Sequence, residues 1–210
     1  MKLYHGSDTE INQPLAKVGR HHLDFGEGFY VTKLKKQATD WAGVIAERKG
    51  RKAQPIVSQY QFDRERAEAD GLRFKIFEEY NLEWLDYVVA CRRGKPVWKH
   101  YDIVEGGVAN DNVIDTVEDY EKGIITAEQA LGQLRYKKVN HQICFISQTA
   151  IDGYLKFEKS SIIKMYGEIL TDKTFVTNPA IARDTEINQM ILALVTPDKS
   201  ALLVGKPGIG

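Results

Sequence analysis

The sequence has little cysteine, no excess of charge and no long hydrophobic run, and each shortage excludes a class of protein. Its only two cysteines, Cys91 and Cys144, belong to no C-x-x-C pair, so neither a disulfide framework nor a zinc site is indicated. The 29 basic and 29 acidic side chains cancel, which disfavours broad binding to a nucleic-acid backbone but leaves a local basic patch open. No apolar run reaches the ~18 residues of a membrane span, and Met1–His5 does not start like a signal peptide. We expect a cytoplasmic, reduced protein that does not contact a membrane.

The residues that are present indicate one substantial folded domain. A chain of 210 residues with 43% hydrophobic composition can bury a core of its own. Strand-like and helix-like stretches alternate over residues 1–159, but at spacings too irregular for a doubly wound sheet, which favours the α+β class. Strands are predicted at 1–6, 29–32, 56–62, 101–104 and 139–146, and helices at 33–49, 75–93, 149–155 and after the capping-box patterns Asp115-x-x-Glu118 and Thr126-x-x-Gln129.

The last part of the chain has a different character. We expect a linker at 160–177 and a separate segment at 178–210, in which an amphipathic helix after Asp184 precedes an apolar strand at 200–204. Gly205 and Gly210 have the glycine spacing of G-x-x-x-x-G-K-[ST], the loop that cradles phosphates. The segment resembles the opening of an AAA-type ATPase domain that stops inside its Walker A loop. Without the lysine and hydroxyl that follow, it cannot hydrolyse ATP.

Two origins of this tail are open. We interpret the sequence as a fragment of a longer reading frame, or as a junction of two genes in which Met165 starts the second one. The alternative is a flexible glycine-rich tail or linker.

Three short stretches stand out by their polar and aromatic residues. The first is Leu3-Tyr4-His5-Gly6-Ser7, in which a histidine ends a strand and a turn follows. The second is Asp24-Phe25-Gly26-Glu27-Gly28-Phe29-Tyr30-Val31-Thr32, with Gln37-Ala38-Thr39-Asp40-Trp41-Ala42 on the next helix. The third is Val139-Asn140-His141-Gln142-Ile143-Cys144-Phe145, a strand that carries polar residues into an apolar run. Each stretch alone is a weak signal, because a histidine after a strand or an aromatic on a helix is usually structural.

Together and in this order, the three stretches resemble the motif regions of the ADP-ribosyltransferase superfamily. The resemblance is to the branch with a histidine, a tyrosine and a third acidic or amide residue, and within it to an uncharacterised bacterial family distantly related to the poly(ADP-ribose) polymerases. It covers residues 1–159. It implies two small, mostly antiparallel sheets, flanked by helices, with an NAD cleft between them. It also implies transfer of ADP-ribose from the co-substrate NAD, without a metal, to a protein or nucleic-acid acceptor.

The resemblance assigns a role to individual residues. His5 is expected to bond the ribose hydroxyls, and the backbone of Gly6 to hold the nicotinamide carboxamide. Tyr30 is expected to stack on the nicotinamide ring, with Trp41 on the other side of a sandwich. The third catalytic position is Gln142, whose carbonyl oxygen can accept a hydrogen bond but cannot take a proton. The catalytic set is therefore His5, Tyr30 and Gln142.

The resemblance also leaves alternatives open. Gln142 argues against efficient chain elongation and favours mono-ADP-ribosyl transfer, in a bacterial toxin–antitoxin or conflict setting. In that setting the protein could be delivered into a target cell, and an antitoxin or other inhibitory partner is implied. One alternative is an NAD-binding sensor domain with little or no catalysis, and another is an NAD glycohydrolase with water as acceptor.

Other polar residues carry weaker signals. His21, His22 and Asp24 could supply metal ligands by type, but their spacing matches no metal motif, and a polar loop above the cleft is the better interpretation. Asn110 and Asp111 are ordinary turn residues that rank only as weak cleft candidates.

Overall fold

The computed structural model describes residues 1–17, 22–50, 53–109, 113–134 and 140–163, together with Thr185, Asn188, Gln189, Ile191 and Leu192. Met1–Tyr166 forms one compact unit and Gly167–Gly210 forms another. The five later residues are helical, and they fall where the helix after Asp184 is expected. The apolar strand, the Walker A-like loop and most of the linker lie outside the described residues, as do His21, Asn110 and Asp111.

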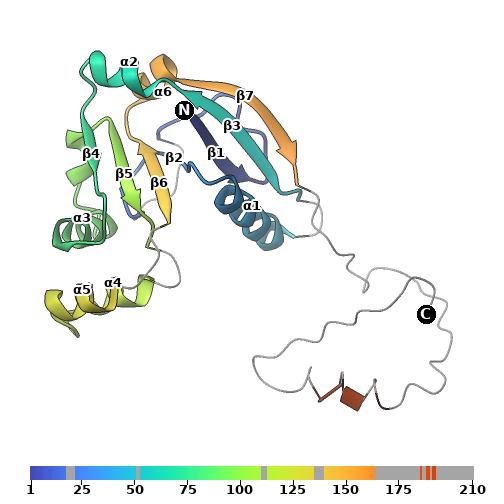
Figure 1. Cartoon of the computed structure of the whole chain (residues 1–210), viewed down its shortest axis with the longest axis vertical. Coiled ribbons are helices and arrows are strands. Elements are labelled where there is room, and N and C mark those ends of the chain that lie inside the picture. The colour runs from blue at the N-terminus through green and yellow to red at the C-terminus, as the bar shows by residue number, and fades with distance from the viewer. Residues whose placement is uncertain are drawn as a thin grey trace. The chain divides into compact units, whose positions relative to one another are not determined.

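The first unit contains two β-sheets (Figure 1). The three-stranded sheet has the order β1 (Lys2–Ser7), β3 (Ile56–Phe62) and β7 (Leu155–Ile162), and every pair is antiparallel. The four-stranded sheet has the order β2 (Phe29–Val31), β6 (His141–Phe145), β5 (Ile103–Gly107) and β4 (Phe74–Ile76), with only the β4–β5 pair parallel. The expected α+β class is confirmed.

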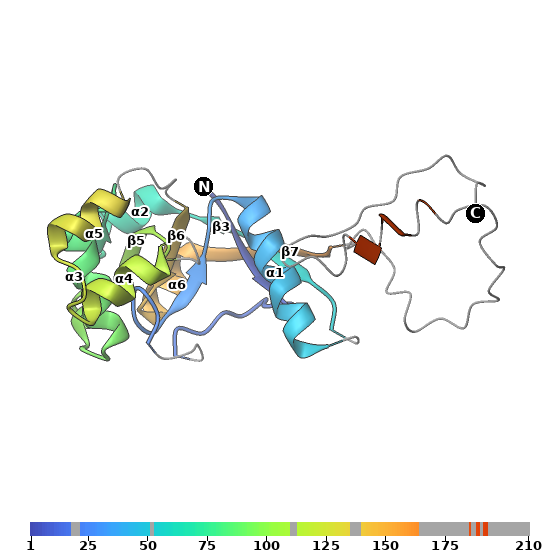
Figure 2. The same cartoon turned by 90° about the horizontal axis from the view of Figure 1, so that it is seen from below.

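Helices flank both sheets. Helix α1 (Lys35–Lys49) packs on β1, and helices α3 (Leu82–Arg92), α4 (Ile114–Glu121) and α5 (Ala127–Leu134) gather near the four-stranded sheet (Figure 2). The shorter helices α2 (Arg64–Ala69) and α6 (Gln148–Tyr154) pack on each other, and the 3-10 turn η1 (Val97–His100) follows α3.

The two sheets meet at the edge strands β1 and β2. The amide of Tyr4 donates to the carbonyl of Thr32 at 2.8 Å, and the amide of Thr32 donates back at 2.9 Å. This single bridge brings the first two sequence motifs side by side, since Tyr4 precedes His5 and Thr32 follows Tyr30 by two residues.

Two apolar clusters lie on opposite faces of the four-stranded sheet and take up alternate side chains of its strands. The first cluster lies on one face of the four-stranded sheet and takes in residues of both sheets, among them Leu3, Phe29, Tyr60, Phe62, Ile143 and Phe145. The second lies on the opposite face, under α3 to α5, and includes Phe25, Phe77, Trp84, Leu85, Val88, Val104 and Cys144. Because neighbouring residues of a strand point to opposite faces, residues 143 and 145 of β6 join the first cluster and residue 144 the second.

The predicted helix at 75–93 is wrong in its first seven residues. Helix α3 starts at Leu82, where the side chain of Asn81 caps the amide of Trp84 at 2.9 Å. Lys75 and Ile76 belong instead to β4, which pairs with β5, and the residues from 77 to 81 form the turn between β4 and α3. Phe77 and Tyr80 have helical spacing relative to Trp84, but the cap at Asn81 and the parallel pairing outweigh that pattern.

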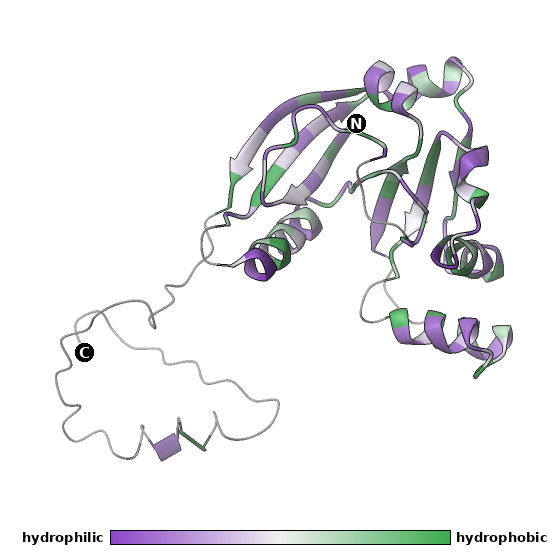
Figure 3. Cartoon of the chain, turned by 180° about the vertical axis from the view of Figure 1, so that it is seen from behind, coloured by the Kyte–Doolittle hydropathy of each residue, from purple (hydrophilic) through white to green (hydrophobic). Residues whose placement is uncertain are grey.

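Other predicted elements agree with the structure more closely. The capping box at Thr126 forms: its amide donates to Oε1 of Gln129 at 2.8 Å, and its hydroxyl accepts from the amide of Gln129 at 3.2 Å. The box at Asp115 does not form, because α4 starts at Ile114 with Val113 at its N-cap, and Asp115 therefore lies in the first turn of the helix. Helix α2 and strand β7 are additions to the prediction, and β7 is mostly hydrophilic after its first residues (Figure 3).

Candidate functional site

His5 is attached to the second motif through the main chain of β2. Its Nδ1 lies 2.7 Å from the carbonyl oxygen of Tyr30, and a carbonyl can only accept, so Nδ1 carries the proton. Burial lowers the pKa of His5, although the bond to Tyr30 opposes that shift. The ring is therefore neutral at pH 7, and its Nε2 is a lone-pair acceptor. Within the described residues Nε2 makes no hydrogen bond, so it can accept one from a ligand hydroxyl.

Tyr30 anchors the loop that precedes its own strand. Its hydroxyl donates to the carbonyl of Gly26 at 2.7 Å and accepts from the amide of Phe25 at 3.0 Å. Burial raises the pKa of Tyr30 well above its usual value, so the hydroxyl stays protonated and keeps both bonds. The loop at 23–28 is thus fixed against the sheet by the residue that the sequence singles out for stacking.

Gln142 lies on the same face of the sheet as Tyr30. Tyr30 is paired with Cys144, and Gln142 is the next residue along β6 that points to that face. Such diagonal neighbours are about 7–8 Å apart. Gln142 is only 8% exposed, and its Nε2 donates to Oδ2 of Asp24 at 3.2 Å and to the carbonyl of Gly107 at 3.3 Å.

Asp24 is a buried carboxylate that sequence reasoning did not assign to the site. It is 7% exposed, and its Oδ1 accepts from Nε and Nη2 of Arg92 at 3.0 and 2.6 Å. Its Oδ2 accepts from the amide of Ala109 at 2.8 Å as well as from Gln142. The sequence signal was an acidic residue directly beside the apolar Phe25, but nothing in the sequence paired it with residues so far along the chain.

The three residues of the predicted catalytic set lie on neighbouring strands, but their side chains do not share one face. Tyr30 and Gln142 share one face of the four-stranded sheet. The ring of His5 lies against Phe29, with centroids 4.7 Å apart, and Phe29 belongs to the cluster on the other face. His5 is therefore joined to the other two through the backbone of β2.

Gly6 is required by the packing of α1. A Cβ atom at this position would lie 2.0 Å from the carbonyl oxygen of Ala38 and 2.9 Å from the amide of Ala42, closer than real contacts allow. The first motif and the helix of the second are thus in direct backbone contact. The absence of a side chain at Gly6 has a structural cause, independent of any role in holding a carboxamide.

Trp41 lies on the outer part of α1. It is 40% exposed, and the guanidinium of Arg48 lies 5.7 Å from its ring centroid. The sandwich of Trp41 with Tyr30 stays a prediction.

A second charged cluster lies on the His5 side of the four-stranded sheet. The carboxylate of Glu105 accepts from Lys33, from Nη1 of Arg64 at 2.6 Å and from Nε2 of His141 at 2.8 Å. Burial would raise the pKa of Glu105, but the hydrogen bonds from these three partners lower it to about 2. No pattern in the sequence indicates this cluster, because its members come from four separate segments.

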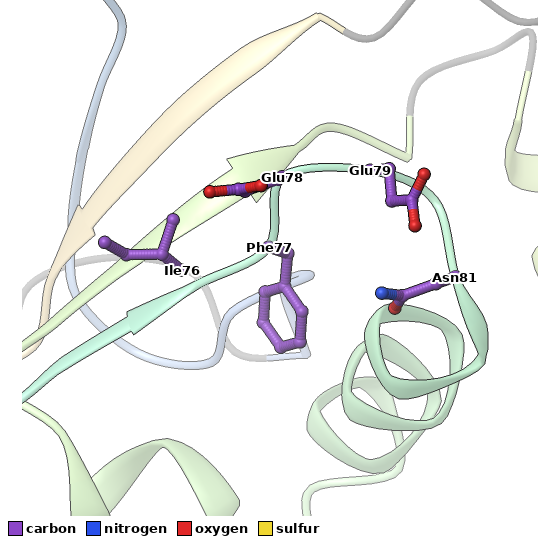
Figure 4. A pocket seen from close by; sticks show the side chains of 5 residues that line it. All are labelled: Ile76, Phe77, Glu78, Glu79 and Asn81. Atoms are coloured by element: carbon purple, nitrogen blue, oxygen red, sulfur yellow. The ribbon is translucent and has the colours of Figure 1, made fainter.

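A pocket of about 500 Å³ lies at the turn between β4 and α3. Figure 4 shows its lining, which consists of Ile76, Phe77, Glu78, Glu79 and Asn81. None of the residues predicted for the site lines it.

The described residues contain no group of three or more His, Cys, Asp or Glu side chains that could hold a metal ion. His22 and Asp24, two of the residues weighed as ligands, both bind Arg92: Nδ1 of His22 lies 2.7 Å from its carbonyl oxygen, and Asp24 pairs with its guanidinium. Among the described residues, no helix has the length and apolar character needed to cross a membrane.

Comparison with protein-family models matches residues 1–157 to the family described as "Protein of unknown function (DUF3990)". The chain belongs to the DUF3990 family. Strands β1, β2 and β6, which carry His5, Tyr30 and Gln142, all lie within the DUF3990 match. Comparison with curated proteins and with solved structures gave no match. Since the description of DUF3990 gives no activity, the chemistry has to follow from the residues of the site.

Proposed function

We propose that this DUF3990 protein is a mono-ADP-ribosyltransferase that uses NAD as co-substrate and modifies a protein or nucleic-acid acceptor. The observation that carries the proposal is that its three motifs lie on the neighbouring strands β1, β2 and β6. His5 bonds the backbone of Tyr30, and Tyr30 and Gln142 share a face on adjacent strands. The superfamily resemblance supplies the reaction, and the hydrogen-bonding capacity of these residues fits it.

In this reaction the bond between nicotinamide and ribose breaks, nicotinamide departs with the bonding electrons, and the acceptor takes the ADP-ribosyl group while it loses a proton. His5 contributes Nε2, a neutral acceptor suited to a ribose hydroxyl. Gln142 contributes Oε1, a second neutral acceptor. The proposal requires both acceptors to reach the same sugar, where they orient it and place partial negative charge near the developing positive charge at its anomeric carbon.

The aromatic face of Tyr30 serves the other half of the substrate. A pyridinium ring carries a positive charge that the negative face of an aromatic ring attracts. Such stacking holds the charged ground state and does not itself accelerate the departure of a neutral ring. We therefore assign Tyr30 to binding and orientation of the nicotinamide, and we assign the acceleration of the reaction to the hydrogen bonds with the ribose.

None of the three residues can take the proton of the acceptor at neutral pH with the geometry described. Nε2 of His5 is assigned to the ribose, Tyr30 keeps its proton, and an amide is not a base. The acceptor proton consequently leaves to solvent or to a group of the acceptor itself. This favours a single transfer per acceptor site over chain elongation.

Nicotinamide release from NAD by the full chain, with and without cell lysate, tests the proposal. Release that requires lysate, together with labelling of a macromolecule, supports the transferase. Equal release without lysate identifies an NAD glycohydrolase, and saturable NAD binding without release identifies a sensor domain. A chain that neither binds NAD nor releases nicotinamide would overturn all three.

A further inference from the structure

A buried carboxylate lies directly behind the amide of Gln142. Asp24 comes from the loop before β2 and Gln142 from β6, and 118 positions separate them in the chain. Both are more than nine-tenths buried, at 7% and 8% exposed. Oδ2 of Asp24 accepts a hydrogen bond from Nε2 of Gln142 at 3.2 Å, so the two residues interact where water does not compete.

These contacts allow the amide only one orientation. The two partners of Nε2 are the carboxylate of Asp24 and the carbonyl of Gly107, and both can only accept. A flipped amide would set Oε1 against two other oxygens. Nε2 therefore faces the protein interior, and Oε1 is left without a hydrogen bond within the described residues.

Arg92 keeps Asp24 in place. Its guanidinium binds Oδ1 through two nitrogens, and its Nη2 lies 3.4 Å from the carbonyl of Ala109, whose amide donates to Oδ2. The bonds from Arg92 to Oδ1 and from the Ala109 amide to Oδ2 fix the plane of the carboxylate, and the guanidinium neutralises its buried charge. Arg92 at the end of α3 and the backbone amide of Ala109 thus hold the carboxylate of Asp24, which orients Gln142.

We propose that Asp24 is a positioning residue for the transfer reaction: it holds Gln142 with Oε1 as the ligand-facing atom, and it excludes a glutamate from position 142. This inference rests on the proposed function for the identity of the ligand, a ribose hydroxyl. A glutamate at 142 would bring a second carboxylate to about the same distance from Asp24, and two buried carboxylates in contact cannot both ionise. The site is built for a neutral acceptor.

A double-mutant cycle, measured by urea unfolding at two pH values in the absence of NAD, tests the orientation of the Gln142 amide. The variants are Gln142→Glu, Asp24→Asn and the double variant, compared with wild type in urea at pH 5 and pH 8. In Gln142→Glu the pKa of the new carboxyl is raised above its unfolded value, so stability falls as the pH rises. We expect the folding equilibrium constant to drop tenfold or more at pH 8 and much less at pH 5.

The background with asparagine at position 24 decides whether Asp24 is the cause. In the Asp24→Asn background, Gln142→Glu is expected to lower the folding equilibrium constant by less than about threefold, with little dependence on pH. An equal loss in both backgrounds, or a loss that does not change with pH, would overturn the inference. If Asp24→Asn does not fold, Asp24→Ser takes its place in the cycle, because it also removes the buried carboxylate and leaves Gln142 unchanged.

NAD affinity then separates positioning from structural support. An asparagine at 24 presents an NH₂ group to Gln142, which favours the flipped amide, and we expect at least tenfold weaker NAD binding. Asp102→Asn is the matched control, because Asp102 also binds an arginine fork, that of Arg73, and accepts a backbone amide, at 2.9 Å. It bonds none of the site residues and should leave NAD affinity unchanged.

The two proposals fail separately. A wild-type chain that does not bind NAD would overturn the proposed function, and the unfolding cycle would still report the orientation of Gln142. A wild-type chain that binds NAD but shows no coupling between Asp24 and Gln142 would overturn the positioning role and leave the transferase standing.

Discussion

Nδ1 of His5 donates a hydrogen bond to the carbonyl oxygen of Tyr30 at 2.7 Å, and this contact joins two motifs that lie 25 residues apart. The bond sets the tautomer of His5, since the carbonyl requires a donor at Nδ1 and the lowered pKa leaves Nε2 unprotonated. The histidine is thereby prepared to accept a hydrogen bond from a ligand.

The packing of Gly6 against α1 predicts a large effect of a single methyl group. In Gly6→Ala the new Cβ would meet the carbonyl of Ala38 at 2.0 Å, so the helix must move away from β1. We expect the free energy of unfolding to fall by about 3 kcal/mol. Gly132→Ala is the control: it lies in α5, where a new methyl group would find no other atom within 4 Å, and it should gain up to about 1 kcal/mol. Urea denaturation measures both, and equal effects would contradict the packing.

Two partly buried tyrosines should respond differently to loss of the hydroxyl. Tyr30→Phe removes bonds to Phe25 and Gly26, and we expect a loss of about 2 kcal/mol in the free energy of unfolding. Tyr87 is matched in type, but its buried hydroxyl has no hydrogen-bond partner within the described residues, so Tyr87→Phe should be neutral or stabilising. Thermal or urea unfolding of the two variants measures the difference, and equal losses would contradict it.

NAD binding by variants of Tyr30 tests the stacking role. Tyr30→Phe keeps the aromatic face and should retain NAD binding, whereas Tyr30→Ala should lose it. Isothermal titration provides both affinities. Loss of binding in Tyr30→Phe while the fold is retained would show that the hydroxyl, and not the ring, matters to the ligand.

The Glu105 cluster predicts a pH-dependent contribution to stability. Its partners lower the pKa from 4.5 to about 2, so the stabilisation is complete above about 4.5 and is lost as the pH falls toward 2. Glu105→Gln should therefore reduce the free energy of unfolding by about 2 kcal/mol at pH 7 and by progressively less on acidification. Glu118→Gln, which breaks an exposed pair with Lys122, should show no such profile. A constant difference between wild type and Glu105→Gln from pH 7 to pH 3 would contradict this assignment.

Local patterns were sufficient for much of the fold. The strand at 56–62 and the capping box at Thr126 rest on alternation and on cap residues, which act over a few positions and appear directly in the sequence. The false start of α3 at residue 75 arose because Phe77 and Tyr80 satisfy helical spacing while β4 depends on a partner strand. Parallel pairing with β5 is a tertiary effect that no local pattern encodes.

The site also contains residues that the sequence indicated and residues that it did not. His5, Tyr30 and Gln142 were accessible because they sit in motifs with a recognisable order. Asp24 and Arg92 were not, because their interactions bridge 68 and 118 residues and depend on burial that a sequence does not display. Arg92 lies in the last turn of α3, where a basic residue is favourable without any partner, so its position in the helix does not indicate its pairing with Asp24.

Transfer of labelled ADP-ribose from NAD to a macromolecule, compared between His5→Ala and His100→Ala, tests the central claim most directly. His100 is an exposed histidine on η1, so its removal controls for loss of an imidazole without touching the site. The proposed function predicts that wild type and His100→Ala label the same acceptor in lysate at similar rates, and that His5→Ala, shown to be folded, loses at least tenfold. Equal labelling by all three proteins would contradict it.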